Sequence, residues 1–259
     1  MLLLTLPIWR QSIRSGQWQR PTAGLAPGYV QANLVILPKS YADEFYEFTQ
    51  KNPKPAPLLE RTMPGDPTPH TYAPTADLRT DVPKYRIFQK GILQAEVTDI
   101  TSLWQDDFVS FLLGCSFTFE MALQAAKIPV RHIDENKNVP MYATNLSCNA
   151  SGRFSGPMVV SMRPIPKERL AEVHKITAQY PLSHGEPVHI GDPAYLGIKD
   201  LYKPDFGDAV PIKDGEVPVF WACGVTPQLT LREAAPMLAI THAPGHMFIT
   251  DMKENEVDA

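Results

Sequence analysis

The hydrophobic pattern of the chain predicts strands and helices that are mixed along its whole length. A β-rich apolar run over residues 29–37 predicts a strand that ends before a proline. Phe45 and Phe48 then share one face of a segment that predicts a helix to about Lys51, with Ser40 as its cap. Residues 52–84 hold eight prolines and almost no periodic pattern, which indicates a functional or wrapping loop rather than a domain linker.

The remaining elements follow from short apolar runs and from the glycines and prolines between them. Residues 85–97, broken at Gly91, predict a hairpin. The other predicted helices cover residues 105–113, 116–126, an amphipathic segment that starts near Pro166, and residues 231–238. The other predicted strands cover residues 129–133, 139–143, 158–162, 188–190, 217–222 and 247–250. The order predicts an α+β fold, a mixed α/β single compact unit, with two intertwined subdomains as the alternative.

Composition narrows the function classes. The chain has 259 residues, 44% hydrophobic and 20% charged, with a formal net charge of -4, as is ordinary for a globular protein. No basic footprint points to nucleic acid or to an acidic membrane surface, and no Walker loop or Gly-x-Gly-x-x-Gly fingerprint points to a nucleotide. A small molecule is therefore the expected partner.

The cysteines and the first residues of the chain indicate the cellular compartment. Three widely spaced cysteines make no disulfide framework and suit a reducing compartment. The apolar run at residues 1–9 is too short to span a bilayer, has no basic residue before it and has no clear cleavage site after it. We expect a packing segment or an extended start, and a cytoplasmic protein.

Three segments in the last third of the chain concentrate histidine, cysteine, glycine and proline: residues 184–193, 219–228 and 241–247. Constrained loops of this kind are a usual way to present reactive side chains. Two of the segments hold four of the seven histidines, namely His184, His189, His242 and His246. The clustering predicts a site.

The four histidines suit general acid and base catalysis, because imidazole titrates near neutral pH. His242 and His246 are separated by a Pro-Gly pair, so they are not the helical metal pair of a zincin. A zinc site completed by Cys223 or Asp192 is one alternative. Hydrogen bonds from the histidines to loop backbone are the structural alternative.

Two turns between a strand and a helix are further candidates. Cys115 and Ser116 stand where a helix should begin, and the N–H groups there favour an anion and lower the pKa of a thiol. The turn then binds a carboxylate or supplies a nucleophilic thiol; alternatively, Ser116 caps the helix and Cys115 fills the core. After the strand over residues 217–222, Cys223 and Thr226 either face a pocket or serve as core and cap.

Arginines and asparagines complete the set of candidates. Arginine is the natural bidentate partner of a substrate carboxylate, which makes Arg163, Arg153 and Arg79 candidates. Each of them is also a candidate for a structural salt bridge. Asn33 and Asn145 supply amides that orient a substrate or bond to a neighbouring loop.

On these motifs the sequence resembles the putative hydro-lyase family, a bacterial group classed with the mitochondrial D-glutamate cyclase. The matching motifs are residues 31–34, 77–83, 114–117 and 159–164 and the three segments of the last third. The resemblance covers residues 28–251 and marks them as one domain, between an N-terminal packing extension (1–27) and a tail (252–259). Since residues 77–83 belong to the matching motifs, we expect the proline-rich segment to cover the site.

The resemblance implies a lyase that adds or removes water, and for the cyclase the conversion of D-glutamate to 5-oxo-D-proline and water. As a hypothesis, Arg163 and the Cys115–Ser116 turn hold carboxylates, while His189 and His242 exchange protons. We expect no cofactor, with a bound metal ion as the alternative.

Two alternatives stay open. One is a metal-dependent hydrolase or lyase that uses the same histidines. The other is a carboxylate-binding module that serves an oxoproline- or amino-acid-processing enzyme, since the longer cyclase carries an additional C-terminal domain. A homo-oligomer is compatible with either.

Overall fold

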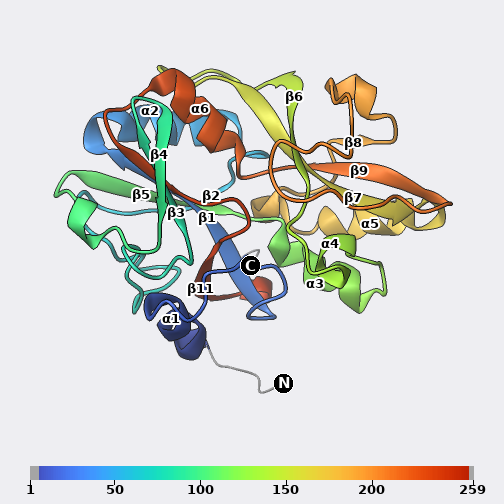
Figure 1. Cartoon of the computed structure of the whole chain (residues 1–259), viewed down its shortest axis with the longest axis horizontal. Coiled ribbons are helices and arrows are strands. Elements are labelled where there is room, and N and C mark those ends of the chain that lie inside the picture. The colour runs from blue at the N-terminus through green and yellow to red at the C-terminus, as the bar shows by residue number, and fades with distance from the viewer. Residues whose placement is uncertain (1–5, 257–259) are drawn as a thin grey trace.

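Two antiparallel sheets form the frame of the protein in the computed structural model, which describes residues 6–256 (Figure 1). Sheet A has the order β2 (Leu58–Arg61), β5 (Phe108–Gly114), β1 (Tyr29–Pro38), β10 (Ala239–His242), β3 (Tyr85–Gln89) and β4 (Ile92–Val97), and β11 (Phe248–Lys253) also pairs with β1. Sheet B has the order β6 (Met141–Ser147), β7 (Pro157–Pro166), β9 (Glu216–Ala222) and β8 (His189–Ile190). Sheets and helices in one compact unit confirm the predicted α+β class.

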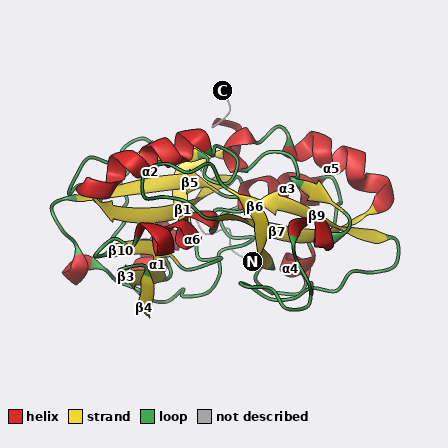
Figure 2. Ribbon diagram, turned by 90° about the horizontal axis from the view of Figure 1, so that it is seen from above, coloured by secondary structure: helices red, strands yellow, loops and turns green. Residues whose placement is uncertain are grey.

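Helices lie on the faces of the two sheets (Figure 2). They are α1 (Leu6–Arg14), α2 (Lys39–Lys51), α3 (Phe117–Ala125), α4 (Arg131–Asp134), α5 (Leu170–Thr177) and α6 (Thr226–Ala234). Short 3-10 turns are η1 (Thr101–Leu103), η2 (Lys167–Arg169), η3 (Pro181–Ser183), η4 (Pro193–Leu196) and η5 (Glu254–Glu256). Over residues 6–256, no helix is long and apolar enough to cross a membrane.

Each sheet is covered in part by a helix that leaves the other sheet. α3 follows β5 of sheet A, yet its Phe119 and Leu123 pack in one cluster with Val219 and Trp221 of sheet B. α6 follows β9 of sheet B, yet its Leu231 packs with residues of β1 and β5 in sheet A. We call the part built around sheet A and the part built around sheet B the two halves of the molecule. They are tied together where the chain crosses from one sheet to the other.

The structure corrects several predictions made from the pattern. Residues 105–113 do not form a helix: β5 lies there, buried along its whole length between β1 and β2, and a continuous apolar run cannot distinguish a central strand from a buried helix. Residues 129–133 do not form a strand, because α4 begins at Arg131. Ser40 is not a cap, since α2 begins at Lys39 and Pro38 precedes it. β10, only four residues long, was not predicted.

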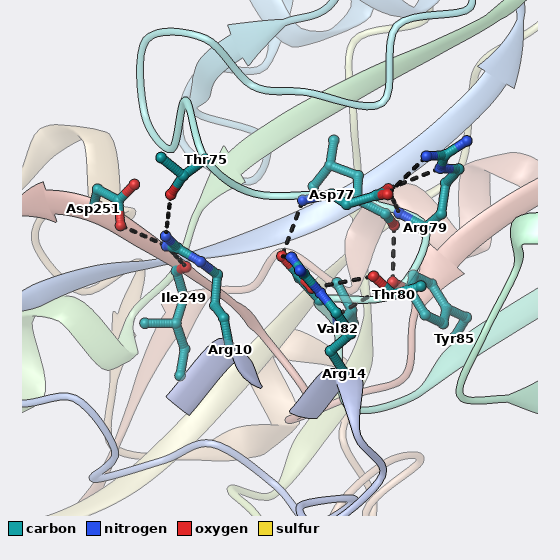
Figure 3. A network of polar contacts seen from close by, with 12 residues as sticks. Arg10, Arg14, Thr75, Asp77, Arg79, Thr80, Val82, Tyr85, Ile249 and Asp251 are labelled. Atoms are coloured by element: carbon teal, nitrogen blue, oxygen red, sulfur yellow. Dashed lines mark hydrogen bonds and ion pairs between the residues drawn. The ribbon is translucent and has the colours of Figure 1, made fainter. Parts of the chain in front are cut away.

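The proline-rich segment contributes β2 to sheet A, and its later part packs against residues of the sheet, where Leu78 and Val82 are fully buried. Its closing motif fastens α1 to the sheet (Figure 3). Asp81, fully buried, accepts two hydrogen bonds from Arg14, at 2.8 Å and 2.7 Å, and one from the backbone N–H of Asp77 at 2.9 Å. One turn earlier on α1, Arg10 donates to Asp251 of β11 at 2.6 Å. Motif 77–83 thus has a structural role in this fold.

Two of the buried histidines belong to the core. His242 of β10 is fully buried, and its Nδ1 accepts the backbone N–H of Leu34 at 3.1 Å. His184 is 1% exposed, and its Nδ1 lies 2.7 Å from the backbone oxygen of Lys54. Burial lowers the pKa of each histidine to about 4, because the charged imidazolium is poorly solvated there.

Replacing Asp81 with alanine is expected to lower the free energy of unfolding by about 2–3 kcal/mol, because Arg14 and the N–H of Asp77 lose a buried acceptor. The control is Asp43→Ala, which removes the ion pair between Asp43 and Arg61. Because the Asp43 side chain is 88% exposed, this substitution should lower the free energy of unfolding by less than about 1 kcal/mol. Urea unfolding measures both. Equal losses in the two variants would contradict the role given to Asp81.

Stability is expected to fall as the pH drops from about 6.5 to about 4, since in this window the unfolded chain binds protons at His184 and His242 and the folded chain does not. The full effect is on the order of 3 kcal/mol for each histidine. Unfolding measured between pH 7.5 and 4.5 should give a shallower pH dependence for His242→Gln than for wild type. The same slope in both proteins would show that His242 does not contribute to the pH dependence of stability. The control variant His70→Gln makes the same substitution at an exposed histidine.

Candidate active site

A buried arginine lies where α3 of one half meets β7 of the other. Arg163 is fully buried, and its Nε donates to Glu120 Oε1 at 2.9 Å. Nη1 donates to Ser161 at 3.0 Å and Nη2 to Ser116 at 2.9 Å. Its guanidinium carbon lies 5.2 Å from the ring centre of Trp221, within cation–π range. All three guanidinium nitrogens are thus engaged by the protein itself.

Glu120 also lies beside a histidine. Nε2 of His132, on α4, is 3.2 Å from Glu120 Oε1, at ion-pair distance although outside good hydrogen-bond alignment. Both side chains are 1% exposed, and the Phe117 ring stacks against the imidazole. Burial alone would raise the pKa of Glu120, but the positive charges of His132 and Arg163 outweigh it and lower that pKa. Glu120 is therefore a carboxylate at neutral pH and can orient His132.

His132 lines a cleft of about 460 Å³, the His132 cleft, between residues 18–25 and the loop after α4. Its walls carry Arg20, Lys137 and Asp208. The Arg20 guanidinium lies over the Trp18 ring at 4.4 Å, and Lys137 contacts Glu135 at 2.8 Å. Lys137 is thus paired with Glu135, and Arg20 is the wall cation without an ion pair among residues 6–256, which favours an anionic ligand beside it.

A second cleft, the His246 cleft, has a volume of about 310 Å³ and is lined by Lys84, Arg86, Glu96 and His246. Its cations are partly neutralised, since Arg86 donates to Glu96 at 2.8 Å and Lys84 lies 3.8 Å from the same carboxylate. His246 Nδ1 lies 3.0 Å from the backbone oxygen of Pro244, and burial lowers its pKa. Asn138 lines both clefts.

Most of the predicted turn residues gather at the junction of the two halves. Cys115 and Cys223 belong to one buried cluster, and Ser116 reaches Arg163. Thr226, at the start of α6, donates to the backbone oxygen of Cys223 at 2.7 Å. Asn33 of β1 donates to the backbone oxygen of Gly114 at 2.6 Å. In each of these contacts, the side chain bonds to another group of the protein at the junction.

The thiols differ from the sequence-based expectation. The pKa of Cys115 was expected to fall at the start of a helix, but burial raises it. Burial also raises the pKa of Cys223, to about 11. Both thiols are therefore protonated at neutral pH.

Other predicted residues lie apart from the junction. His189 of sheet B contacts the backbone oxygen of Asp192 at 2.8 Å and packs beside Phe220, whereas His242 lies in sheet A. Asn145 is exposed on β6, and Arg79 forms an ion pair with Asp77 at 2.8 Å. Arg153 is held in the same way by Glu44, at 2.7 Å. Within residues 6–256, no three His, Cys, Asp or Glu side chains lie together as metal ligands.

Sequence reasoning missed the pairing of His132 with Glu120. His132 fell in a segment interpreted as a strand, and Glu120 was interpreted only as a first-turn residue of α3. One signal was available: Glu120 is the single charged residue of the helix Phe117–Ala125, whose other residues are mostly apolar. A lone acid on a buried helix needs a partner.

Comparisons with known proteins agree on one family. The family model for D-glutamate cyclase matches residues 109–251. A protein of Geobacillus kaustophilus named as a putative hydro-lyase is 59% identical over 248 residues, which cover 96% of this chain and 94% of the relative. One of Thermoanaerobacter sp. with the same name is 60% identical, over 95% of this chain and 92% of its own.

Among solved structures, a nitrogen repressor-like protein from Methanococcus jannaschii is aligned over 95% of this chain and 98% of its own, with 9% identity and a TM-score of 0.37. A similarity this low supports no argument about fold or function. The sequence relatives and the family model show the family. The chain belongs to the D-glutamate cyclase family, together with bacterial proteins named as hydro-lyases.

Proposed function

We propose that the protein is a hydro-lyase acting on a small amino or carboxylic acid, and that the reaction takes place in the His132 cleft. The observation that carries the proposal is the contact between His132 and Glu120 at the wall of that cleft. A histidine oriented by a buried carboxylate is a usual general acid–base arrangement. Contacts of this kind are often poorly aligned before a ligand binds, which fits the geometry of the pair.

D-glutamate is the proposed substrate, taken from the family relationship, with 5-oxo-D-proline and water as products. In this reaction the amine nitrogen bonds to the carbon of the γ-carboxyl group, and one oxygen of that group leaves as water. The ammonium group loses two protons as it becomes the ring amide, and the departing carboxylate oxygen gains two protons to leave as water. His132 can pass these protons one after the other from the nitrogen to the oxygen, through the ring nitrogen that does not face Glu120.

The remaining groups have supporting roles in this proposal. Arg20 and Lys137 attract and orient the carboxylates of the substrate. Arg163, fully bonded by the protein, is a positioning residue that, together with His132, lowers the pKa of Glu120. This differs from the sequence-based hypothesis, in which Arg163 held the substrate and His189 and His242 exchanged protons; those roles stay predictions.

We also propose a cytoplasmic location, supported by three cysteines that are all free and buried. A small carboxylate is the proposed partner.

Proton NMR of the purified protein with D-glutamate, and separately with 5-oxo-D-proline, tests the proposal, with the L-isomers as controls. Conversion of one enantiomer only is expected. Tight binding of D-glutamate without turnover would instead support a carboxylate-binding module. If neither compound is bound nor converted, the proposed substrate is wrong.

His132→Gln is expected to lower kcat/KM by about 10²–10⁴-fold, the usual contribution of a general acid–base group. His70→Gln makes the same substitution at an exposed histidine and should leave kcat/KM within about twofold of wild type. The rate of substrate loss, followed by NMR, measures both variants. A His132→Gln enzyme within tenfold of wild type would place proton transfer elsewhere.

If Glu120 acts through His132, the two substitutions should not add. Glu120→Gln is expected to lower kcat, and the double variant Glu120→Gln/His132→Gln should be about as slow as His132→Gln alone. Additive losses would show that the two residues act independently. Circular dichroism checks that each variant is folded, since Glu120→Gln leaves Arg163 with a weaker acceptor.

A further inference from the structure

A small cavity of about 10 Å³, with room for a single water-sized species, lies between residues 24–31 and α3. Gly24, Leu25 and Ile133 line both this cavity and the His132 cleft, so the two are neighbours. Four acid or amide side chains line it: Gln31 of β1, Glu120 and Gln124 of α3, and Glu254 of η5.

The amide of Gln31 is held in a fixed orientation. Gln31 is 4% exposed, and its Nε2 donates to the backbone oxygens of Thr22 and Leu25, each at 3.0 Å. Because both of these partners are acceptors, the nitrogen must face them, and Oε1 is the atom left over. Oε1 is buried and has no donor among residues 6–256.

The two acids leave further oxygens unpaired. Glu120 is 1% exposed; its Oε1 accepts from Arg163, while the part of the chain that the structure describes offers no donor to Oε2. The backbone N–H of Glu254 donates to the oxygen of Gly28 at 3.1 Å, which holds η5 over the cavity. No ion pair or hydrogen bond of the Glu254 carboxyl is found with the described side chains.

We propose that Gln31 Oε1, Glu120 Oε2 and the Glu254 carboxylate bind one hard cation of the Mg²⁺ or Ca²⁺ class. Oxygen ligands from carboxylates and an amide are the set that such ions prefer. A water molecule could donate to only two of the three acceptors. Burial raises the pKa of the Glu254 carboxyl to about 7, because the protein compensates its charged form poorly, and a bound cation would stabilise that form.

This site is separate from the histidine-based metal site considered from the sequence, because it uses none of those histidines. It also goes beyond the proposed activity, since the cation would sit on the oxygen of Glu120 that does not face His132. In that position it would fasten η5 and β1 to α3, three elements that meet at the cavity. Binding is therefore expected to stabilise the fold, whether or not the protein turns over D-glutamate.

The test uses tag-free, full-length protein that has been treated with a chelator and then titrated with CaCl₂ or MgCl₂. Calorimetry should show about one site with a Kd below about 1 mM, and thermal unfolding should show a saturable rise in Tm with the same midpoint. NaCl at equal ionic strength controls for screening of surface charge, and ZnCl₂ tests the preference for a hard ion.

Two variants in the same 3-10 turn locate the site. Glu254→Gln removes one charged ligand and should weaken binding at least about tenfold, whereas Glu256→Gln, at an exposed acid two residues away, should bind like wild type within about twofold. Absence of saturable Ca²⁺ or Mg²⁺ binding by the wild type would overturn the proposal. Unweakened binding by Glu254→Gln would overturn it as well.

Discussion

The ion pair between Arg163 and Glu120 is the interaction on which the junction of the two sheets depends. Arg163 comes from sheet B, and Glu120 comes from the helix that leaves sheet A. Both charges are removed from water, so each is tolerable only while the other is in place and the remaining N–H groups are bonded, as Ser116 and Ser161 provide. Sliding one sheet along the other would separate these charges in a dry environment. The pair therefore fixes the register of the two halves, and with it the position of His132.

The exchange of helices between the sheets needs very close backbone approach at both crossings. At Gly114, where β5 leads into α3, a Cβ atom would collide with the backbone oxygen of Leu182. At Gly224, between β9 and α6, a Cβ atom would collide with the amide of Asn33. The cysteines beside these glycines, Cys115 and Cys223, fill the space between the crossings as small apolar groups. The motifs that look reactive in the sequence are thus explained in large part by the geometry of the crossing.

The sequence predicts local structure well where the apolar period is clear and fails where burial is complete. β1, the hairpin of β3 and β4, and the helices α3 and α5 follow from their patterns. β5 does not, since its FVSFLLG run is buried on both faces and shows no alternation. For the candidate site, the pattern could name Arg163 and Ser116 but not their partner Glu120, because that pairing joins residues 43 positions apart in the sequence. His184 and His242 stood out in the sequence as candidates, and burial lowers the pKa of each to about 4, so both are neutral at neutral pH.

The same buried charges connect the stability of the fold to the chemistry proposed for it. A histidine at the wall of a cleft titrates with the solvent unless something sets its orientation and charge. Here the carboxylate beside His132 cannot readily take a proton, because His132 and Arg163 together hold its pKa low. Under the proposed function, the arrangement that holds the two sheets in register also gives His132 an ionised partner.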